Sequence, residues 1–252
     1  MEIRQIVLPL LLTCFAAIFT VLGSLVSFLI RDFKKTYLNF GLGLSAGVMI
    51  YVSFVELFAT SARDIGFFKA NIAFFAGILI VMLIDFVIPH EYIEEHISMT
   101  SHQRKVLASG VLITFGIAIH NFPEGLAVLM SSLVDIKLGV SLALAIALHN
   151  FPEGVAISLP IFYATKSKKK AFWYSFLAGI AEPVGALIGL LILMPFLSPA
   201  VLSFTLAFVA GIMVFISFDE LLPLSYQGGE YHISILGVII GMLIMALSLS
   251  LF

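Results

Sequence analysis

Long apolar stretches, separated by short polar or turn-forming breaks, follow one another along the whole sequence. A helix that crosses a bilayer needs about 20 mostly apolar residues. Eight stretches reach that length, and we place them near residues 5–30, 38–60, 69–88, 106–131, 138–164, 171–195, 200–222 and 232–251. The pattern predicts an all-α integral membrane protein with eight transmembrane helices, folded as a single polytopic domain over residues 1–252.

The connections between these stretches are short, and the first stretch is long for a signal peptide. The longest connection runs from about 89 to 105, which leaves no room for a soluble catalytic domain. The apolar run from Ile6 to Ile30 exceeds the roughly 7 to 15 residues of a signal-peptide core. We therefore expect the first stretch to be a retained helix and the chemistry to take place within the membrane.

Composition agrees with the hydrophobic pattern. Hydrophobic residues make up 61% of the chain and charged residues only 11%, whereas a soluble domain carries roughly 25% charged residues. The 13 Lys and Arg residues do not outnumber the 15 Asp and Glu residues, so the chain has no basic surplus for neutralising nucleic acid phosphates. A single cysteine, Cys14, excludes an intramolecular disulfide.

The basic residues are distributed unequally between the two ends of the predicted spans. Short cytoplasmic loops are enriched in Lys and Arg. The odd-numbered connections carry nine of these residues: Arg31, Lys34, Lys35, Arg104, Lys105, Lys166, Lys168, Lys169 and Lys170. The opposite side carries Arg4, Arg63, Lys69 and Lys137. This bias predicts a multi-pass protein of the cell inner (plasma) membrane with both termini outside the cytoplasm.

The acidic residues show the opposite behaviour, because seven of them fall inside the apolar stretches: Glu56, Asp85, Glu124, Glu153, Glu182, Asp219 and Glu220. An ionised side chain at the bilayer centre costs about 2.5 to 3.5 kcal/mol even on the milder insertion scales, and such residues are usually functional. Glu124, Glu153 and Glu182 lie deepest and have no Lys or Arg nearby in the spans. They require protons or metal cations to neutralise them.

Two of the deep glutamates belong to a hexapeptide that occurs twice. His-Asn-Phe-Pro-Glu-Gly occupies residues 120–125 and again residues 149–154. On a helix, the histidine and the glutamate four residues later share a face, and the asparagine lies three residues before the glutamate. Pro123 and Pro152 remove backbone hydrogen bonds within the span, so we expect each helix to kink and to free a carbonyl beside these side chains. Glu182-Pro183 repeats the Glu-Pro element in the sixth stretch.

This set of residue types indicates a site for a transition metal. Imidazole and carboxylate ligands suit zinc above all, and also iron, manganese, cobalt, nickel or cadmium, whereas calcium and magnesium prefer oxygen ligands. A lone histidine in an apolar helix is more often a packing residue. Two identical copies in separate spans argue against that interpretation, and the ligands suffice for two adjacent ions.

Other polar positions support weaker hypotheses. Met49 and Ser53, upstream of Glu56, offer sulfur and hydroxyl groups, although a methionine in an apolar helix usually serves packing. Helix-end solvation is an alternative explanation for Glu56, Asp85, Asp219 and Glu220. The third connection carries a loose group that fits either metal capture or an ordinary solvated loop: His90, Glu91, Glu94, Glu95, His96 and His102.

Taken together, these motifs resemble the ZIP (Zrt-, Irt-like protein) family of metal transporters, and within it the bacterial ZupT-type subgroup. The likeness rests on the duplicated hexapeptide, on Ala181-Glu182-Pro183 and on the segment 218–223, Phe-Asp-Glu-Leu-Leu-Pro, and it covers essentially the whole chain. The resemblance implies a 3+2+3 helix arrangement with a pseudo-two-fold inverted repeat. It also implies a primary site of His120, Glu124, His149 and Glu153, and a second site of Asn121, Asn150, Glu182 and the shared glutamates.

The favoured hypothesis is that the protein transports divalent zinc, and related transition metals, into the cytoplasm. Movement of the central helix pair would expose the site alternately to the two sides. In this hypothesis zinc is the bound substrate rather than a catalytic cofactor, and the partners are divalent metal ions, the lipid bilayer and, as a candidate, a second copy of the chain. The alternatives are an intramembrane zinc hydrolase, in which a glutamate activates water, and a metal exporter. The uptake direction follows from the resemblance alone.

Overall fold

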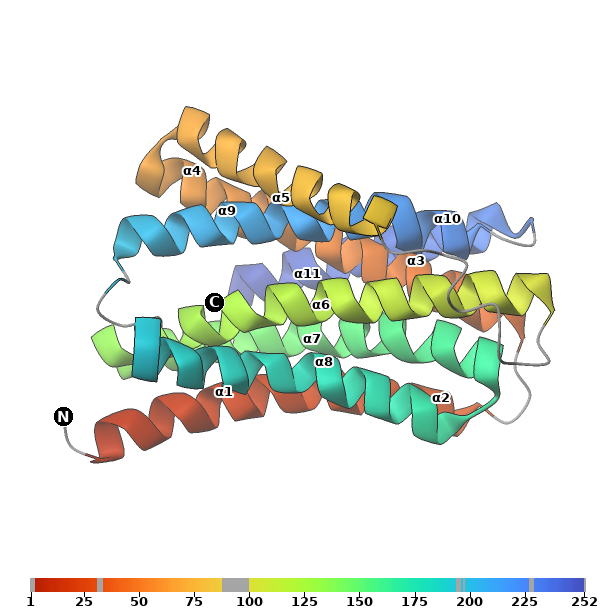
Figure 1. The fold of residues 1–252 in the computed structure, drawn as a ribbon, viewed down its shortest axis with the longest axis horizontal. Helices are drawn as coiled ribbons and strands as arrows, with labels where there is room; N and C mark the ends of the chain where they lie inside the picture. Colours follow the sequence, from red (N-terminus) through yellow and green to blue (C-terminus); the bar gives the residue numbers. More distant parts are fainter. Residues whose placement is uncertain are drawn as a thin grey trace.

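A computed structural model describes residues 3–30, 34–87, 100–193, 196, 198–226 and 229–251 of the chain. This part of the chain is helical almost throughout, as Figure 1 shows. The α-helices are α1 (Ile3–Ser24), α2 (Val26–Leu29), α3 (Lys35–Val52), α4 (Ala59–Ile65), α5 (Phe67–Val87), α6 (Ser101–Val134), α7 (Ile136–Thr165), α8 (Lys168–Ile188), α9 (Pro199–Ile216), α10 (Leu222–Ser225) and α11 (Tyr231–Leu251). Three π-helical segments continue α3, α8 and α9, at Ser53–Phe58, Gly189–Leu193 and Ser217–Leu221.

The prediction of eight membrane spans is confirmed for the described residues. Eight helical stretches are long and apolar enough to cross a membrane: Ile6–Leu29, Lys35–Ile65, Phe67–Ile84, His102–Val134, Ile136–Thr165, Lys168–Ile192, Pro199–Ser225 and Tyr231–Ser250. Each coincides with one of the expected stretches. Large apolar side chains such as those of Leu29, Phe68 and Phe86 remain exposed on the outside of the bundle, where a bilayer would cover them.

Several helices extend beyond the apolar stretches that predicted them, because polar residues begin and end them. The α6 helix starts at a capping box in which Thr100 accepts a hydrogen bond from the Gln103 amide and the Gln103 side chain accepts one from the Thr100 amide. It ends at Asp135, whose side chain in turn caps the start of α7. Hydrophobicity alone does not detect such capped polar turns.

The prolines of the duplicated hexapeptide do not end their helices. Pro123 lies inside α6 and Pro152 inside α7, and both helices are continuous through these positions. The carbonyl oxygen of Pro152 accepts a 2.6 Å hydrogen bond from Ser45 Oγ of α3. The prolines therefore do not interrupt either helix, and one backbone carbonyl of the second hexapeptide also accepts a hydrogen bond from a neighbouring helix.

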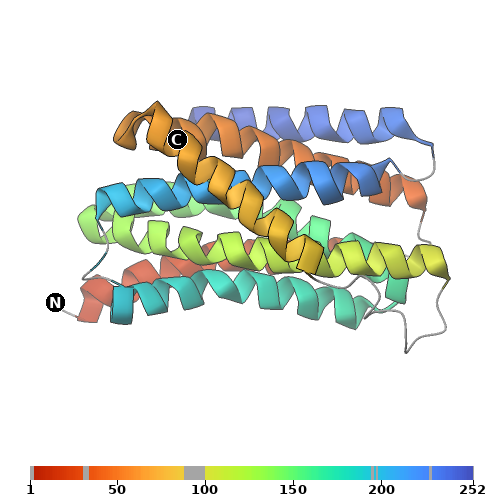
Figure 2. The same cartoon turned by 45° about the horizontal axis from the view of Figure 1, so that its top comes forward.

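The helices pack in two groups, which Figures 1 and 2 show as two halves of the bundle. In one group α6 and α7 lie side by side, with α1 along α7 and α8 along α6. In the other, α3 packs on α11 and α5 packs on α9. The two groups meet where α3 contacts α7 and α9 contacts α6. Both termini lie at the same end of the bundle (Figure 1), as an even number of spans requires.

Glycines allow the helices of each group to touch through their backbones. A Cβ atom on Gly154 of α7 would collide with the Thr20 carbonyl of α1, and a Cβ atom on Gly125 of α6 would collide with the Glu182 carbonyl of α8. Small residues are the usual means of close helix packing in membranes. These contacts hold α1 and α8 tightly against the central pair.

Candidate metal site

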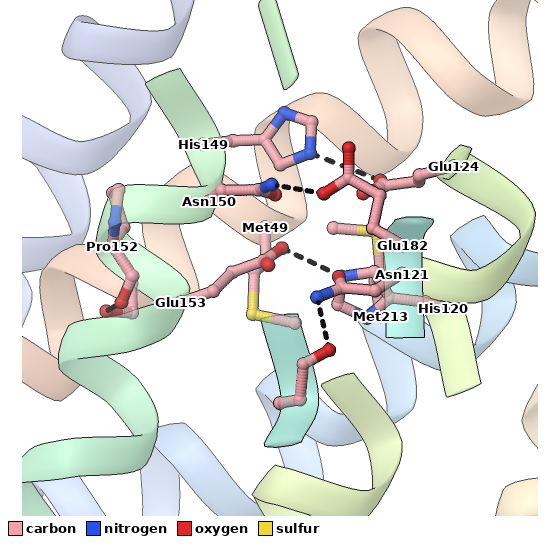
Figure 3. Close-up of polar contacts among 12 residues, drawn as sticks. Met49, His120, Asn121, Glu124, His149, Asn150, Pro152, Glu153, Glu182 and Met213 are labelled. Carbon is pink, nitrogen blue, oxygen red and sulfur yellow. Dashed lines mark hydrogen bonds and ion pairs between the residues drawn. The ribbon is translucent and has the colours of Figure 1, made fainter. Parts of the chain in front are cut away.

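The polar residues of the duplicated hexapeptide lie at the centre of the α1–α6–α7–α8 group and are almost completely buried. Exposed fractions are at most 3% for the seven residues His120, Asn121, Glu124, His149, Asn150, Glu153 and Glu182. They come from α6, α7 and α8, as Figure 3 shows. All of the residues that the sequence indicated as metal ligands are therefore brought into one region.

The two copies of the hexapeptide are cross-linked by their own side chains. His120 Nε2 of α6 lies 2.8 Å from Glu153 Oε1 of α7, and His149 Nε2 of α7 lies 3.1 Å from Glu124 Oε1 of α6. The helical spacing had suggested that each histidine would work with the glutamate of its own copy. The structure instead pairs each histidine with the glutamate of the other copy, because α6 and α7 pack side by side at this level (Figure 3).

The asparagines attach the pair to the flanking helices. Asn121 Nδ2 donates a 3.0 Å hydrogen bond to the Ala178 carbonyl of α8, and Asn150 Nδ2 donates a 3.1 Å hydrogen bond to the Ala16 carbonyl of α1. Asn150 Nδ2 also donates a 2.8 Å hydrogen bond to Glu182 Oε2. Both amide nitrogens therefore donate hydrogen bonds, whereas neither amide oxygen accepts one from the described residues.

Several oxygens in this region have no hydrogen-bond partner among the described residues. They are Oδ1 of the two asparagines and one carboxylate oxygen of each glutamate, namely Asn121 Oδ1, Asn150 Oδ1, Glu124 Oε2, Glu153 Oε2 and Glu182 Oε1. Leaving a buried polar atom unpaired is costly. Five acceptor oxygens in a region without a Lys or Arg side chain form an environment that a cation would stabilise.

The side chains are paired with one another rather than arranged around a common point. Within the part of the chain that the structure describes, no three His, Cys, Asp or Glu side chains are grouped as ready metal ligands. The imidazole Nε2 atoms and one oxygen of each paired carboxylate already contact each other. A metal ion that takes these atoms as ligands must therefore replace the two His–Glu contacts, which requires side-chain rotation.

A cavity of about 260 Å³ connects this region with one end of the bundle. Its wall includes Glu124 and His149 at the inner side and Glu56, Asp64 and Ser203 further out. Ser203 Oγ donates a 2.7 Å hydrogen bond to Asp64 Oδ2. The sequence left the role of Glu56 undecided between function and helix-end solvation. It did not indicate Asp64, because Asp64 lies in the last turn of α4 at the edge of its span, where carboxylates are common.

The structure also reveals a second internal repeat that the sequence analysis missed. Residues 47–57 and 211–221 both fit Gly-x-Met-x-x-x-Ser-Phe-x-Glu-Leu, and in both copies a π-helical segment begins at the serine. Ser53 Oγ bonds the Met49 carbonyl at 2.6 Å and Ser217 Oγ bonds the Met213 carbonyl at 2.7 Å. Met49 and Met213 are fully buried beside the site (Figure 3). A comparison of the sequence with itself would have found this repeat.

The remaining candidates lie on other elements or outside the described part of the chain. Glu220 is buried, with an exposed fraction of 8%, and Asp219 is exposed; both belong to the π-helical segment that continues α9. His102 is exposed in the first turn of α6. The Asp85 side chain and the residues His90, Glu91, Glu94, Glu95 and His96 of the third connection lie outside the described residues.

Known zinc transporters are similar to this chain over nearly its whole length. A family model described as "ZIP Zinc transporter" matches residues 88–249. Over 254 residues the chain is 48% identical to the zinc transporter ZupT of Streptococcus mutans, covering 96% of both proteins. It is 50% identical over 255 residues to ZupT of Chlorobium phaeovibrioides, covering 95% of this chain and 96% of the relative, and 43% identical over 279 residues to ZupT of Clostridium perfringens, covering 100% and 98%.

Proposed function

Since the chain belongs to the ZIP zinc transporter family, we propose that it carries divalent zinc, and related transition metals, across the membrane through the site formed by His120, Asn121, Glu124, His149, Asn150, Glu153 and Glu182. The observation that carries this assignment is the pair of crossed His–Glu contacts at the centre of the α1–α6–α7–α8 group. The zinc ion is the substrate in this proposal, and no catalytic cofactor is involved.

The donor set supports a borderline transition metal as the substrate. Two imidazoles, three carboxylates and two amide oxygens can replace the hydration shell of zinc. Among the described residues, no Lys or Arg side chain pairs with the buried glutamates, so a bound cation would neutralise their negative charge. Ligands have to be deprotonated to coordinate, so metal binding displaces any proton that the His–Glu pairs share.

The 260 Å³ cavity supports an access route to the site from the end of the bundle at which both termini lie. Its carboxylates Glu56 and Asp64 would attract a cation, and His149 and Glu124 would receive it. We place this end outside the cytoplasm because the basic residues concentrate at the opposite end. In the direction of uptake, which rests on the family resemblance, metal would then leave past Glu220 across the inner membrane.

The division of the helices into two groups supports movement of a whole group rather than of the central pair alone, which the sequence had suggested. The central pair α6 and α7 contacts α1 and α8 through their backbones at Gly154 and Gly125, so a shift of the pair alone would break these contacts. We propose that α1, α6, α7 and α8 move together relative to α3, α5, α9 and α11, and that this displacement exposes the site alternately to the two sides.

The hydrolase alternative is not supported. The relatives that match the chain over nearly its whole length are named zinc transporters, and the glutamates are engaged with histidine and asparagine side chains. Transport needs no open coordination position for an attacking water. The proposed partners are divalent metal ions as substrate and the lipid bilayer as environment. A second copy of the chain remains a candidate partner.

Zinc uptake by proteoliposomes tests the site assignment. We expect His120→Ala and Glu153→Ala to lower the uptake rate on the order of 10- to 100-fold, because each removes one ligand and leaves its partner unpaired. His102→Ala, on the same helix but exposed at its first turn, is the matched control and should transport at the wild-type rate. Wild-type rates in both site variants would refute the assignment.

A further inference from the structure

The contacts of α1 and α8 with the central pair repeat each other residue by residue. The Ala16 carbonyl of α1 accepts a hydrogen bond from Asn150 of one hexapeptide, and the Ala178 carbonyl of α8 accepts one from Asn121 of the other. Seven residues further along each helix, Gly23 lies against the Phe151 carbonyl and Gly185 lies against the Phe122 carbonyl. The α1 and α8 helices are therefore equivalent in the two halves of the inverted repeat.

This equivalence places Thr20 opposite Glu182. Four residues after Ala16 and Ala178, the Thr20 carbonyl lies against Gly154 and the Glu182 carbonyl lies against Gly125. The same offset of 162 positions joins all three pairs, since 178 − 16, 182 − 20 and 185 − 23 are equal. Thr20 thus has the register in α1 that Glu182 has in α8.

Thr20 is buried where α1 meets α7 and α8, the helices that carry the residues of the site. Its side chain is completely buried, with an exposed fraction of 0%, and its hydroxyl oxygen has no hydrogen-bond partner among the described residues. The side chain borders Gly179 of α8, where an added Cβ atom would lie 3.3 Å from Thr20 Cβ and 3.7 Å from its methyl carbon. A threonine hydroxyl in a span usually bonds a carbonyl of its own helix, as Thr13 does with Leu10 at 2.8 Å. Thr20 does not.

We propose that Thr20 is a specificity-determining residue of the cation site, because it keeps neutral the position at which the other half of the repeat holds Glu182. This inference rests on the proposed function. The new element is that Thr20, an α1 residue outside both hexapeptides, limits the number of carboxylates in the site to three. The acid count matters because more carboxylate oxygens favour harder cations such as Mn²⁺ and Ca²⁺ over zinc.

The test moves the carboxylate from one half of the repeat to the other. Zinc binding by calorimetry and competition of Mn²⁺ and Ca²⁺ with zinc uptake are measured for the full chain carrying Thr20→Asp, Glu182→Gln or both substitutions. We expect Thr20→Asp to shift the competition on the order of tenfold towards Mn²⁺. We expect Glu182→Gln to weaken zinc binding, and the double variant, which again has three acids, to recover most of that loss.

Neutral variants and folding controls complete the test. Thr20→Val, which removes only the hydroxyl, should keep the metal preference of the wild type, as should Thr13→Val about two turns earlier on α1. Size-exclusion chromatography and thermal unfolding report folding. A Thr20→Asp variant that folds only together with Glu182→Gln also supports the inference, because it shows that the two positions share one charge.

Three results would overturn the inference: unchanged competition in a folded Thr20→Asp variant, a double variant that binds zinc no better than Glu182→Gln, or failure of both Thr20→Asp variants to fold. A failure of the proposed function looks different. In that case the wild-type protein itself neither binds nor transports zinc, whatever residue stands at position 20.

Discussion

The central residues of this protein gain their chemical meaning from contacts between the two hexapeptides. A buried histidine or glutamate alone would be a packing residue or an unpaired charge of high cost. The crossed contacts of His120 with Glu153 and of His149 with Glu124 give each a partner of the opposite character. The residue types were predictable because the motif occurs twice. The partner of each histidine was not, because it depends on how α6 and α7 are aligned.

A double-mutant cycle tests the crossed pairing. In zinc-free protein, the alanine variants of His120 and Glu153 should be coupled by about 0.5–3 kcal/mol in unfolding free energy, the range typical of side chains in contact. The variants of His120 and Glu124, which belong to the same hexapeptide but are not hydrogen-bonded to each other, should be coupled more weakly. Unfolding in detergent with a chelator present supplies both measurements. Equal coupling in the two cycles would contradict the pairing.

Helices in this protein are defined by hydrophobicity along their length and by polar residues at their ends. The apolar runs predicted the eight spans, but capping residues such as Thr100 and Asp135 set where α6 ends and α7 begins. The π-helical segments after α3 and α9 begin at the serines of the second repeat, Ser53 and Ser217. Such segments are frequent at functional sites, and hydrophobicity does not distinguish them from regular helix.

Close packing between helices yields a prediction for Gly154. A methyl group there meets the backbone carbonyl of Thr20, which cannot move aside without shifting α1. Gly154→Ala should therefore destabilise the protein by about 1–3 kcal/mol, the usual cost of overpacking, and lower the midpoint of thermal unfolding in detergent. Gly189→Ala is the control, because a methyl group there meets only side chains: it collides with the flexible end of Leu126 and lies at ordinary contact distance from Leu129. Equal stabilities of the two variants would contradict the argument.

At the scale of the whole molecule, the two helix groups differ in what they contribute. The α1–α6–α7–α8 group holds every residue of the crossed site, whereas the other group contributes Met49, Met213 and the outer wall of the cavity. The sequence had suggested a central pair that moves between its neighbours. The observed packing joins that pair to α1 and α8, because glycines let these four helices approach through their backbones.

Cross-linking distinguishes movement of the whole group from movement of the pair. In a Cys14→Ser background, a thiol reagent bridging Gly116→Cys of α6 with Ile216→Cys of α9 should stop zinc uptake, because it joins the two groups. Bridging Gly189→Cys with Leu126→Cys, which lie within one group and in similar contact, should leave uptake intact. Uptake that continues after the first bridge has formed would refute the proposed movement.

The orientation of the molecule gives the last prediction. A single cysteine at Asp135, at the end that holds both termini, should react in whole cells with a maleimide that cannot cross membranes, because we place that end outside the cytoplasm. A cysteine at Lys169 of the basic fifth connection should react only after the cells are opened. The reverse labelling pattern would invert the orientation and place the mouth of the 260 Å³ cavity on the cytoplasmic side.

The sequence alone determined the membrane location and the number of spans and indicated the residues proposed for the site, because hydrophobicity, buried charge and exact repetition can be read along the chain. The tertiary structure decided how those residues are combined: which histidine meets which glutamate, which helices form one group and which residue lies opposite Glu182 in the repeat. These features depend on the alignment of packed helices. That alignment is set by glycine contacts such as those of Gly125 and Gly154 between segments far apart in the sequence.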